Sequence, residues 1–334
     1  MKKEESCGLA ALGVSGPGSR RTSFLAWLRG PRGHARPAAK VSGIVILVFM
    51  ATSTSCKSPL AIGQDGGQLA DGQDATEGRN GFTQISARVG FVCGLRGDGS
   101  VTCSGANDFG QATAPAGTFT QISTGGRQTC GLTPDGGVIC WGDNQYGESA
   151  PPAGTFVQVS TGYWHTCGLR TDGTVTCWGY DAYGQATPPA GTFAQISAGG
   201  WHTCGLRADG SAACWGLNDS GQTDPPAGSF TEVSAGNYHT CGLRAGGSAS
   251  CWGYNPFGQS SVPGGTFTQI SAGSDETCGL RADGKAACWG LNRDGRTTTP
   301  AGTFIQISAG SDNPCGLRSD RSVICWGTSL TLEP

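Results

Sequence analysis

Charged side chains are scarce in this sequence, and so are long apolar runs. Only 14% of the 334 residues are charged, a composition that excludes a coiled coil and a charged disordered tail. The longest apolar run, residues 41–51, has about half of the roughly twenty residues that a membrane-spanning helix needs. Glycine is abundant, with 58 residues, but it does not recur at every third position, which excludes collagen. Nine Trp and stretches of alternating Val, Ile and Thr indicate an all-β protein rich in tight turns.

Charge is divided unevenly along the chain. Residues 1–79 hold ten basic and six acidic side chains, net +4, whereas residues 80–334 hold twelve and eighteen, net −6. A protein that binds DNA or RNA needs a basic stripe to displace counterions. The acidic body therefore excludes nucleic acid as the expected partner.

Residues 1–56 have the layout of an export signal, with a basic region, a short apolar core and small residues before a cysteine. The small residues before Cys56 resemble the signal of a bacterial lipoprotein, in which that cysteine becomes the lipidated first residue. Two features depart from that pattern, because Ser53 stands where such signals usually have Leu and the region before the apolar core is about forty residues long. Ordinary export with cleavage nearby and an uncleaved anchor are the alternatives. We expect a protein of the bacterial cell envelope, anchored through Cys56, or a secreted one. Residues 57–79 are expected to be a flexible spacer, since they hold almost no large apolar side chains.

From residue 80 onward the sequence repeats every 37 residues without an insertion. Seven phenylalanines mark the period, namely Phe82, Phe119, Phe156, Phe193, Phe230, Phe267 and Phe304. A repeat of this length is typical of a ring or array in which each unit packs on its neighbours. We therefore predict one repeat domain over residues 80–334.

Each unit has three β-like stretches, as residues 155–191 show. F-V-Q-V-S alternates apolar and polar residues, H-T-C-G-L-R does so weakly, and T-V-T-C-W-G is rich in β-branched and aromatic residues. The loop Thr171-Asp172-Gly173 predicts a three-residue hairpin whose glycine is left-handed. The seventh repeat has Arg321 at this glycine position, which we expect to cost about 1–2 kcal/mol.

Fourteen cysteines lie in seven pairs, ten residues apart within each pair. With the hairpin centred on Asp172, Cys167 faces Cys177, and opposed positions of an antiparallel pair can meet disulfide distances. One alternative is free thiols in a cytosolic protein, which the predicted export signal makes less favoured. The other is zinc, which is less favoured because each pair supplies two ligands and a structural zinc site needs four. The same register in every repeat predicts seven disulfides, Cys93–Cys103, Cys130–Cys140, Cys167–Cys177, Cys204–Cys214, Cys241–Cys251, Cys278–Cys288 and Cys315–Cys325.

The string from His165 to Gln185 resembles the repeat of the regulator of chromosome condensation family, in which a His, an apolar pair, D-G, V, W-G, N and G-Q recur in this order. The resemblance implies an all-β fold, a seven-bladed β-propeller. The unit is shorter than in the nuclear member that gives the family its name, and it has room for about three antiparallel strands per blade. In that respect it is similar to the secreted propeller-type beta-lactamase inhibitor protein. The first repeat has Ser104 in place of Trp and Arg88 in place of Gly, and the seventh has Pro314 in place of Thr. These departures fall where the ring has to close.

Irregular positions of the repeat are the candidates for function, since fold alone supplies no activity. The position two before the threonine of H-T-C changes from Arg through Trp and Tyr to Asp along the chain. Exposed Trp and Tyr are typical of binding hot spots, although rings at these positions would also suit packing between blades. A second candidate surface, expected on the other rim, holds Tyr146, Tyr183 and Phe257. The first pattern predicts a partner-binding face with basic, aromatic and acidic sectors, made of Arg127, Tyr163, Trp164, Trp201, Asn237, Tyr238, Asp275, Glu276 and Asp312.

The repeats hold neither a catalytic constellation nor a phosphate loop, so we expect no enzyme and no cofactor. Three histidines, His165, His202 and His239, would lie on successive blades about 10 Å apart, too far for one metal ion. They predict structural hydrogen bonds and no metal site. We therefore predict a monomeric module that binds a protein or a glycan. The alternatives are a guanine-nucleotide exchange factor, as nuclear members of the family imply, and a polysaccharide-acting enzyme.

Overall fold

The computed structural model describes residues 81–328 and 330–333. The predicted leader (1–56), its lipidation site Cys56 and the predicted spacer (57–79) lie outside these residues. Within the described ranges, no helix is long and apolar enough to cross a membrane.

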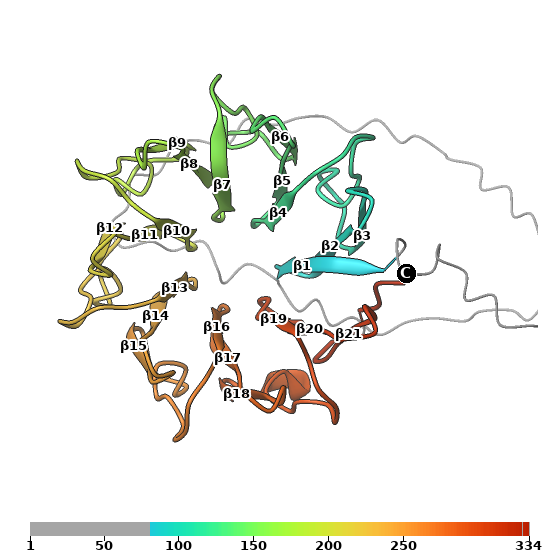
Figure 1. Ribbon diagram of the computed structural model, residues 1–334, viewed down its shortest axis with the longest axis vertical. Coiled ribbons are helices and arrows are strands. Elements are labelled where there is room, and N and C mark those ends of the chain that lie inside the picture. The colour runs from blue at the N-terminus through green and yellow to red at the C-terminus, as the bar shows by residue number, and fades with distance from the viewer. Residues whose placement is uncertain (1–80, 329, 334) are drawn as a thin grey trace, which may run out of the picture. The chain divides into compact units, whose positions relative to one another are not determined.

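The described chain forms seven antiparallel sheets of three strands, and in every sheet the strands follow one another in chain order. Figure 1 shows the sheets as blades around a common centre, with the first strand of each blade innermost. The predicted seven-bladed, all-β propeller is thus confirmed. The blades are β1 (Phe82–Arg88), β2 (Phe91–Arg96) and β3 (Val101–Gly105); β4 (Gln121–Thr124), β5 (Gln128–Leu132) and β6 (Val138–Gly142); β7 (Phe156–Thr161), β8 (His165–Arg170) and β9 (Val175–Gly179); β10 (Gln195–Ala198), β11 (His202–Leu206) and β12 (Ala212–Gly216); β13 (Glu232–Ala235), β14 (His239–Leu243) and β15 (Ala249–Gly253); β16 (Gln269–Ala272), β17 (Glu276–Leu280) and β18 (Ala286–Gly290), which the short 3₁₀ turn η1 (Arg293–Gly295) follows; and β19 (Gln306–Ser308), β20 (Cys315–Leu317) and β21 (Val323–Cys325).

The hairpin register is the one predicted from the sequence. Cys167 on β8 pairs with Cys177 on β9, and all seven predicted disulfides form, each with a Cα–Cα distance of 4.0 Å. The hairpin glycine of blade 3, Gly173, has φ of 80°, and Arg321 takes the same left-handed conformation in blade 7 with φ of 68°. The strain expected at Arg321 is therefore present in the fold.

Neighbouring blades pack through a unit that recurs with the repeat. The ring of Phe156 on β7 covers Gly168 on β8, where a Cβ atom would come within 2.4 Å of the ring. The Arg170 guanidinium carbon lies 4.7 Å from the centroid of the same ring, and the Trp178 ring lies 6.0 Å from it. Phe156 also packs on Cys130 and neighbouring apolar residues of blade 2. The repeated Phe, Gly, Arg and Trp are therefore parts of one inter-blade contact.

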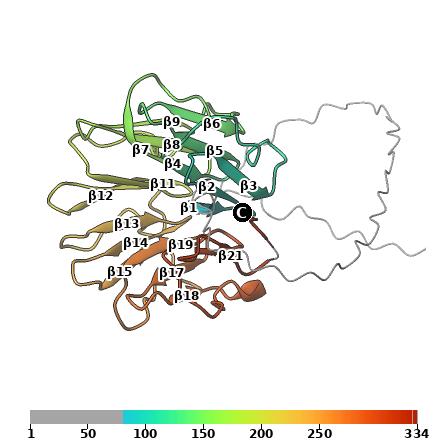
Figure 2. The ribbon, with the colours of Figure 1, turned by 45° about the vertical axis from the view of Figure 1, so that its right-hand side comes forward.

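The ring closes between blade 1 and blade 7 through the kind of glutamine contact that Gln84 makes with Ile122 of the next blade. β1 pairs with β2 within its own blade, so the first strand does not complete the last blade. The N–H of Ile85 donates to Oε1 of Gln306 at 2.8 Å, and Nε2 of Gln306 donates to the carbonyl of Ile85 at 3.2 Å. Blade 1 has Ser104 where other blades have Trp, and the buried Leu332 packs in the cluster of Phe82 instead. In both views the C-terminal segment lies beside β1 (Figure 1, Figure 2).

Candidate functional site

Two loops of every blade meet at the same end of the ring, and we call this end the aromatic rim. One loop joins the first strand to the second, and the other follows the third strand. They meet because the second and third strands are antiparallel, which places His165 at the start of β8 opposite Gly179 at the end of β9. The N–H of Tyr180 accordingly donates to the carbonyl of Trp164 at 2.7 Å. The opposite end, made by the hairpin loops and the blade connections, is the hairpin rim.

The expectation that Tyr146, Tyr183 and Phe257 form a surface on the other rim is wrong. The Tyr146 ring lies 5.9 Å from that of Trp164, and the Tyr183 ring lies 5.8 Å from that of Trp201. Phe257 joins the same rim through Tyr254, which touches Tyr238. The antiparallel return of the third strand carries these loops to the aromatic rim.

Six rings from blades 2, 3 and 4 form one aromatic cluster: Tyr146, Tyr163, Trp164, Tyr180, Tyr183 and Trp201. Trp164 and Trp201 stand at its centre, with ring centroids 4.7 Å apart in an edge-to-face arrangement. Neither Trp is fully buried, and Tyr146 and Tyr183 remain 42% and 47% exposed. The buried rings between blades are other residues, such as Trp215 against Phe193. The cluster therefore offers a continuous, partly exposed aromatic surface.

The basic sector beside the cluster consists of Arg127. Its guanidinium carbon lies 4.4 Å from the centroid of the Phe109 ring, and its Nη1 lies 3.9 Å from a carboxylate oxygen of Asp143. The side chain remains 47% exposed. On the far side of the cluster, Tyr238 is partly exposed and touches Tyr254.

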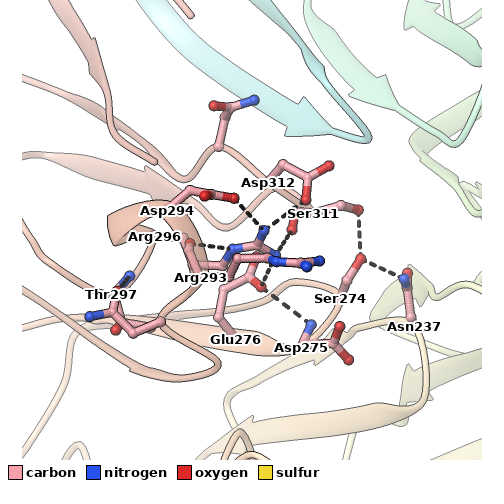
Figure 3. Close-up of polar contacts among 12 residues, drawn as sticks. Asn237, Ser274, Asp275, Glu276, Arg293, Asp294, Arg296, Thr297, Ser311 and Asp312 are labelled. Carbon is pink, nitrogen blue, oxygen red and sulfur yellow. Dashed lines mark hydrogen bonds and ion pairs between the residues drawn. The ribbon is translucent and has the colours of Figure 1, made fainter. Parts of the chain in front are cut away.

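The acidic sector is organised around a buried arginine that the sequence interpretation missed. Arg296 occupies the repeat position that is Gln259 in the preceding blade, and its side chain is buried among acidic and polar residues (Figure 3). Its guanidinium nitrogens lie 2.9 Å from Asp312 and 3.7 Å from Glu276. Burial raises the pKa of Glu276 to about 8, against the opposing pull of Arg296. Burial also raises the pKa of the partly exposed Asp275.

The predicted contact residues therefore divide into two groups. Glu276 and Asn237 are buried and hold their neighbours in place. The other predicted contact residues keep exposed or partly exposed surface on the aromatic rim: Arg127, Tyr163, Trp164, Trp201, Tyr238, Asp275 and Asp312. The signal for Arg296 was present in the repeat alignment, as an Arg in a column of Gln and Glu.

A polar network crosses the centre of the aromatic rim. Arg88 extends from the end of β1 to blade 4, where it donates to the carbonyl of Ala198 at 3.3 Å, and to blade 5, where it donates to Oδ1 of Asn237 at 3.4 Å. Its guanidinium carbon lies 5.5 Å from the centroid of the Tyr163 ring. Nδ2 of Asn237 donates to the Tyr163 hydroxyl at 2.6 Å and also bonds Ser274. Four blades thus meet through side chains at the ring centre.

The three histidines have a structural role, as predicted. Nε2 of His165 lies 2.8 Å from the hydroxyl of Thr203 on the next blade, and His202 and His239 repeat this contact with the following blades. Burial lowers the pKa of each histidine to about 3, so all three are neutral. Among the described residues there is no group of three metal-ligating side chains.

Five of the seven repeats match the profile described as "Regulator of chromosome condensation (RCC1) repeat", over residues 119–148, 156–185, 193–222, 230–259 and 267–296. A comparison with curated proteins found no match. Among solved structures, the ectodomain of the receptor kinase CR4 from Physcomitrella patens is 30% identical with a TM-score of 0.65, over 74% of this chain and 73% of that one. The CRINKLY WD40 ectodomain of the Arabidopsis thaliana receptor kinase ACR4 is 28% identical with a TM-score of 0.63, over 74% and 97%. Prp20p from Saccharomyces cerevisiae, at 16% identity and a TM-score of 0.61 over 68% and 80%, shares the fold.

Proposed function

Since the chain belongs to the regulator of chromosome condensation repeat family, we propose that it is an exported binding module that holds a partner protein on its aromatic rim. The aromatic cluster is the observation that carries this proposal. Trp164 and Trp201 meet there from adjacent blades, and Tyr146 and Tyr183 stay over 40% exposed at its edge. Partly exposed Trp and Tyr beside charged groups are typical of the hot spots that dominate protein interfaces.

Export is supported by the disulfides and by the solved structures. Seven disulfides are typical of proteins that fold in an oxidising compartment. Two of the similar structures are receptor-kinase ectodomains. We propose anchoring through lipidated Cys56, which Cys56→Ser would test by moving the protein from the membrane fraction to the soluble fraction. A protein that stays in the membrane fraction after this change would contradict lipidation at Cys56.

Catalysis is not part of the proposal. A guanine-nucleotide exchange factor works on a cytosolic GTPase, which an exported protein does not meet. Mass spectrometry without reduction tests this point, since seven intact disulfides in protein from its native host support export. Free thiols in cytosolic protein would instead favour the exchange-factor alternative.

Capture experiments with the intact protein test the binding face. The bait is incubated with envelope and secreted proteins of the host, and bound proteins are identified by mass spectrometry. We expect Trp164→Ala and Trp201→Ala to remain folded and to lose a partner that the unaltered protein retains. Val157→Ala is the matched control, because Val157 is 51% exposed at the start of β7 on the hairpin rim.

Each outcome of the capture experiment bears on the proposal. Loss of the partner in the Trp variants alone supports the aromatic rim. Equal capture by all variants would mean that the partner binds another surface. If the Trp variants no longer unfold cooperatively, the two rings would instead be needed for packing of the fold. If glycosidase treatment of the extract abolishes capture, the ligand of the aromatic rim would be a glycan and not a protein.

A further inference from the structure

Arg88 departs from the repeat at the end of β1. The other six repeats have glycine at this place, between the first strand and the rim loop. These glycines are closely packed, and a Cβ atom on Gly125 would come within 2.5 Å of the carbonyl oxygen of Gly162. Blade 1 instead has a long side chain that reaches across the ring to blades 4 and 5.

The Arg88 guanidinium has no carboxylate partner. Among the described residues, no Asp or Glu oxygen lies within 4.0 Å of it, whereas Arg127 and Arg296 on the same rim have carboxylates within that distance. Its acceptors are neutral and distant, the Ala198 carbonyl at 3.3 Å and the Asn237 amide oxygen at 3.4 Å. Burial lowers the pKa of Arg88. A partly buried cation without an anion is costly, and an incoming anion would remove that cost.

The surroundings of Arg88 join its charge to the aromatic cluster. Tyr163 neighbours both, because its ring is 5.5 Å from the Arg88 guanidinium carbon and 6.2 Å from the Trp201 ring. Successive Cα atoms of a peptide are about 3.8 Å apart. A carboxylate at Arg88 and an apolar side chain on Trp201 therefore fit within two or three residues of one extended segment.

We propose that Arg88 binds an Asp or Glu side chain on a loop of the partner protein, while an apolar residue next to it packs on Trp201 and Trp164. This inference rests on the proposed function and names the chemistry of the partner. The planar guanidinium suits a carboxylate, with which it forms two parallel hydrogen bonds.

A peptide fits this surface better than an acidic sugar. Trp201 meets Tyr163 at an interplanar angle of 90° and Tyr183 at 86°. The rings thus present a mixture of edges and faces, which matches the irregular shape of a protein loop. A sugar ring would need an open aromatic face on which to stack.

Titrations with two capped peptides test the proposal, with tryptophan fluorescence and calorimetry as readouts. The probes are acetyl-Phe-Glu-Phe-amide and its Gln counterpart, which differ in the carboxylate alone. We expect the intact protein to bind the Glu peptide about tenfold or more tightly than the Gln peptide, because hydrogen bonds between charged groups are worth that much. Equal affinity for the two peptides would overturn the role of Arg88 and leave the aromatic rim as a binding face.

Variants separate the carboxylate site from the stability of the ring. Arg88→Gly restores the residue of the other six repeats and should fold, bind the Gln peptide as before and lose the preference for Glu. Arg88→Lys keeps the charge without the planar fork and should keep a smaller preference. Arg293→Ala is the control, because Arg293 is an exposed cation of the η1 turn outside the proposed contact.

Besides equal affinity for the two peptides, three results of these titrations would overturn the proposal. They are a preference for Glu that persists in Arg88→Gly, the absence of saturable binding of the Glu peptide, and tighter binding of glucuronate than of the peptide. The last result would assign the site to an acidic glycan. Loss of partner capture in the Trp variants but not in Arg88→Gly would keep the proposed function and reject the carboxylate site.

Discussion

Glu232 interrupts a ring of glutamines that joins the inner strands, and its replacement by Gln should stabilise the protein at alkaline pH. Gln84 shows the regular contact, since its Oε1 accepts the N–H of Ile122 at 2.9 Å and its Nε2 donates to the carbonyl of the same residue at 3.1 Å. Glu232 keeps the first bond, with its Oε1 3.2 Å from the N–H of Ile270. An ionised carboxylate has no proton to donate to a carbonyl, so only the protonated acid matches the glutamines.

The magnitude follows from the pKa of Glu232, which burial raises from 4.5 to about 7. Between these values the folded protein holds a proton that the unfolded chain has lost, so stability falls as the pH rises through this window. A difference of about 2.5 pKa units corresponds to about 3 kcal/mol at 1.36 kcal/mol per unit. Glu232→Gln removes this loss and should raise the free energy of unfolding by about 3 kcal/mol at pH 8.5. At pH 4.5 the gain should be small.

Urea unfolding of both proteins at the two pH values measures this difference. Other groups with raised pKa values, such as Glu276, are present in both proteins and cancel from the comparison. The reverse change Gln195→Glu in the preceding blade is the matched control, because Gln195 makes the same bond to the N–H of Val233 at 2.9 Å. It should destabilise the protein at pH 8.5 and much less at pH 4.5. A gain from Glu232→Gln that is equal at both pH values, or absent at pH 8.5, would refute the reasoning.

Three further changes act on the repeat unit, and denaturant unfolding measures each. Arg321→Gly should raise the free energy of unfolding by about 1 kcal/mol, since Arg321 is left-handed with φ of 68°; no gain would mean that the turn relaxes around Arg. Gly205→Ala should lower it by about 1–3 kcal/mol, because the new Cβ would come within 2.5 Å of the Phe193 ring, and a neutral effect would show that the ring moves aside. Replacing Cys167 and Cys177 together by Ala should lower it by about 3 kcal/mol through the lost loop closure over ten residues, and unchanged stability would contradict the chain-entropy account.

Much of the fold was predictable from the sequence because each repeat contains the residues that set the pairing register of its strands. A period of 37 residues, a three-residue hairpin with glycine and cysteines ten apart leave few arrangements, and Cys167 does pair with Cys177. The same reasoning placed the left-handed turn at Arg321. Local geometry decides these features, so one repeat contains all the information that they need.

The end of the ring on which each loop lies also follows from the strand order within one blade, contrary to the expectation of two separate surfaces. Three antiparallel strands return the chain to the end of the ring that holds the first loop. Tyr146 and Tyr183 therefore had to lie on the rim of Trp164 and Trp201, where the ring contacts place them. Counting strand directions would have joined the two candidate surfaces into one.

Contacts across the ring are different, because they depend on how blades distant in sequence face one another after closure. Arg88 meets Ala198 and Asn237, which are 110 and 149 residues away, and no local pattern encodes those distances. The sequence does show two positions at which one repeat departs from the others. Arg88 stands where the other repeats have glycine, and Arg296 stands where they have Gln or Glu. Arg296 forms ion pairs within the protein, with the carboxylates of Glu276 and Asp312. Arg88 has none within 4.0 Å among the described residues, and for that reason we assign its partner to another molecule.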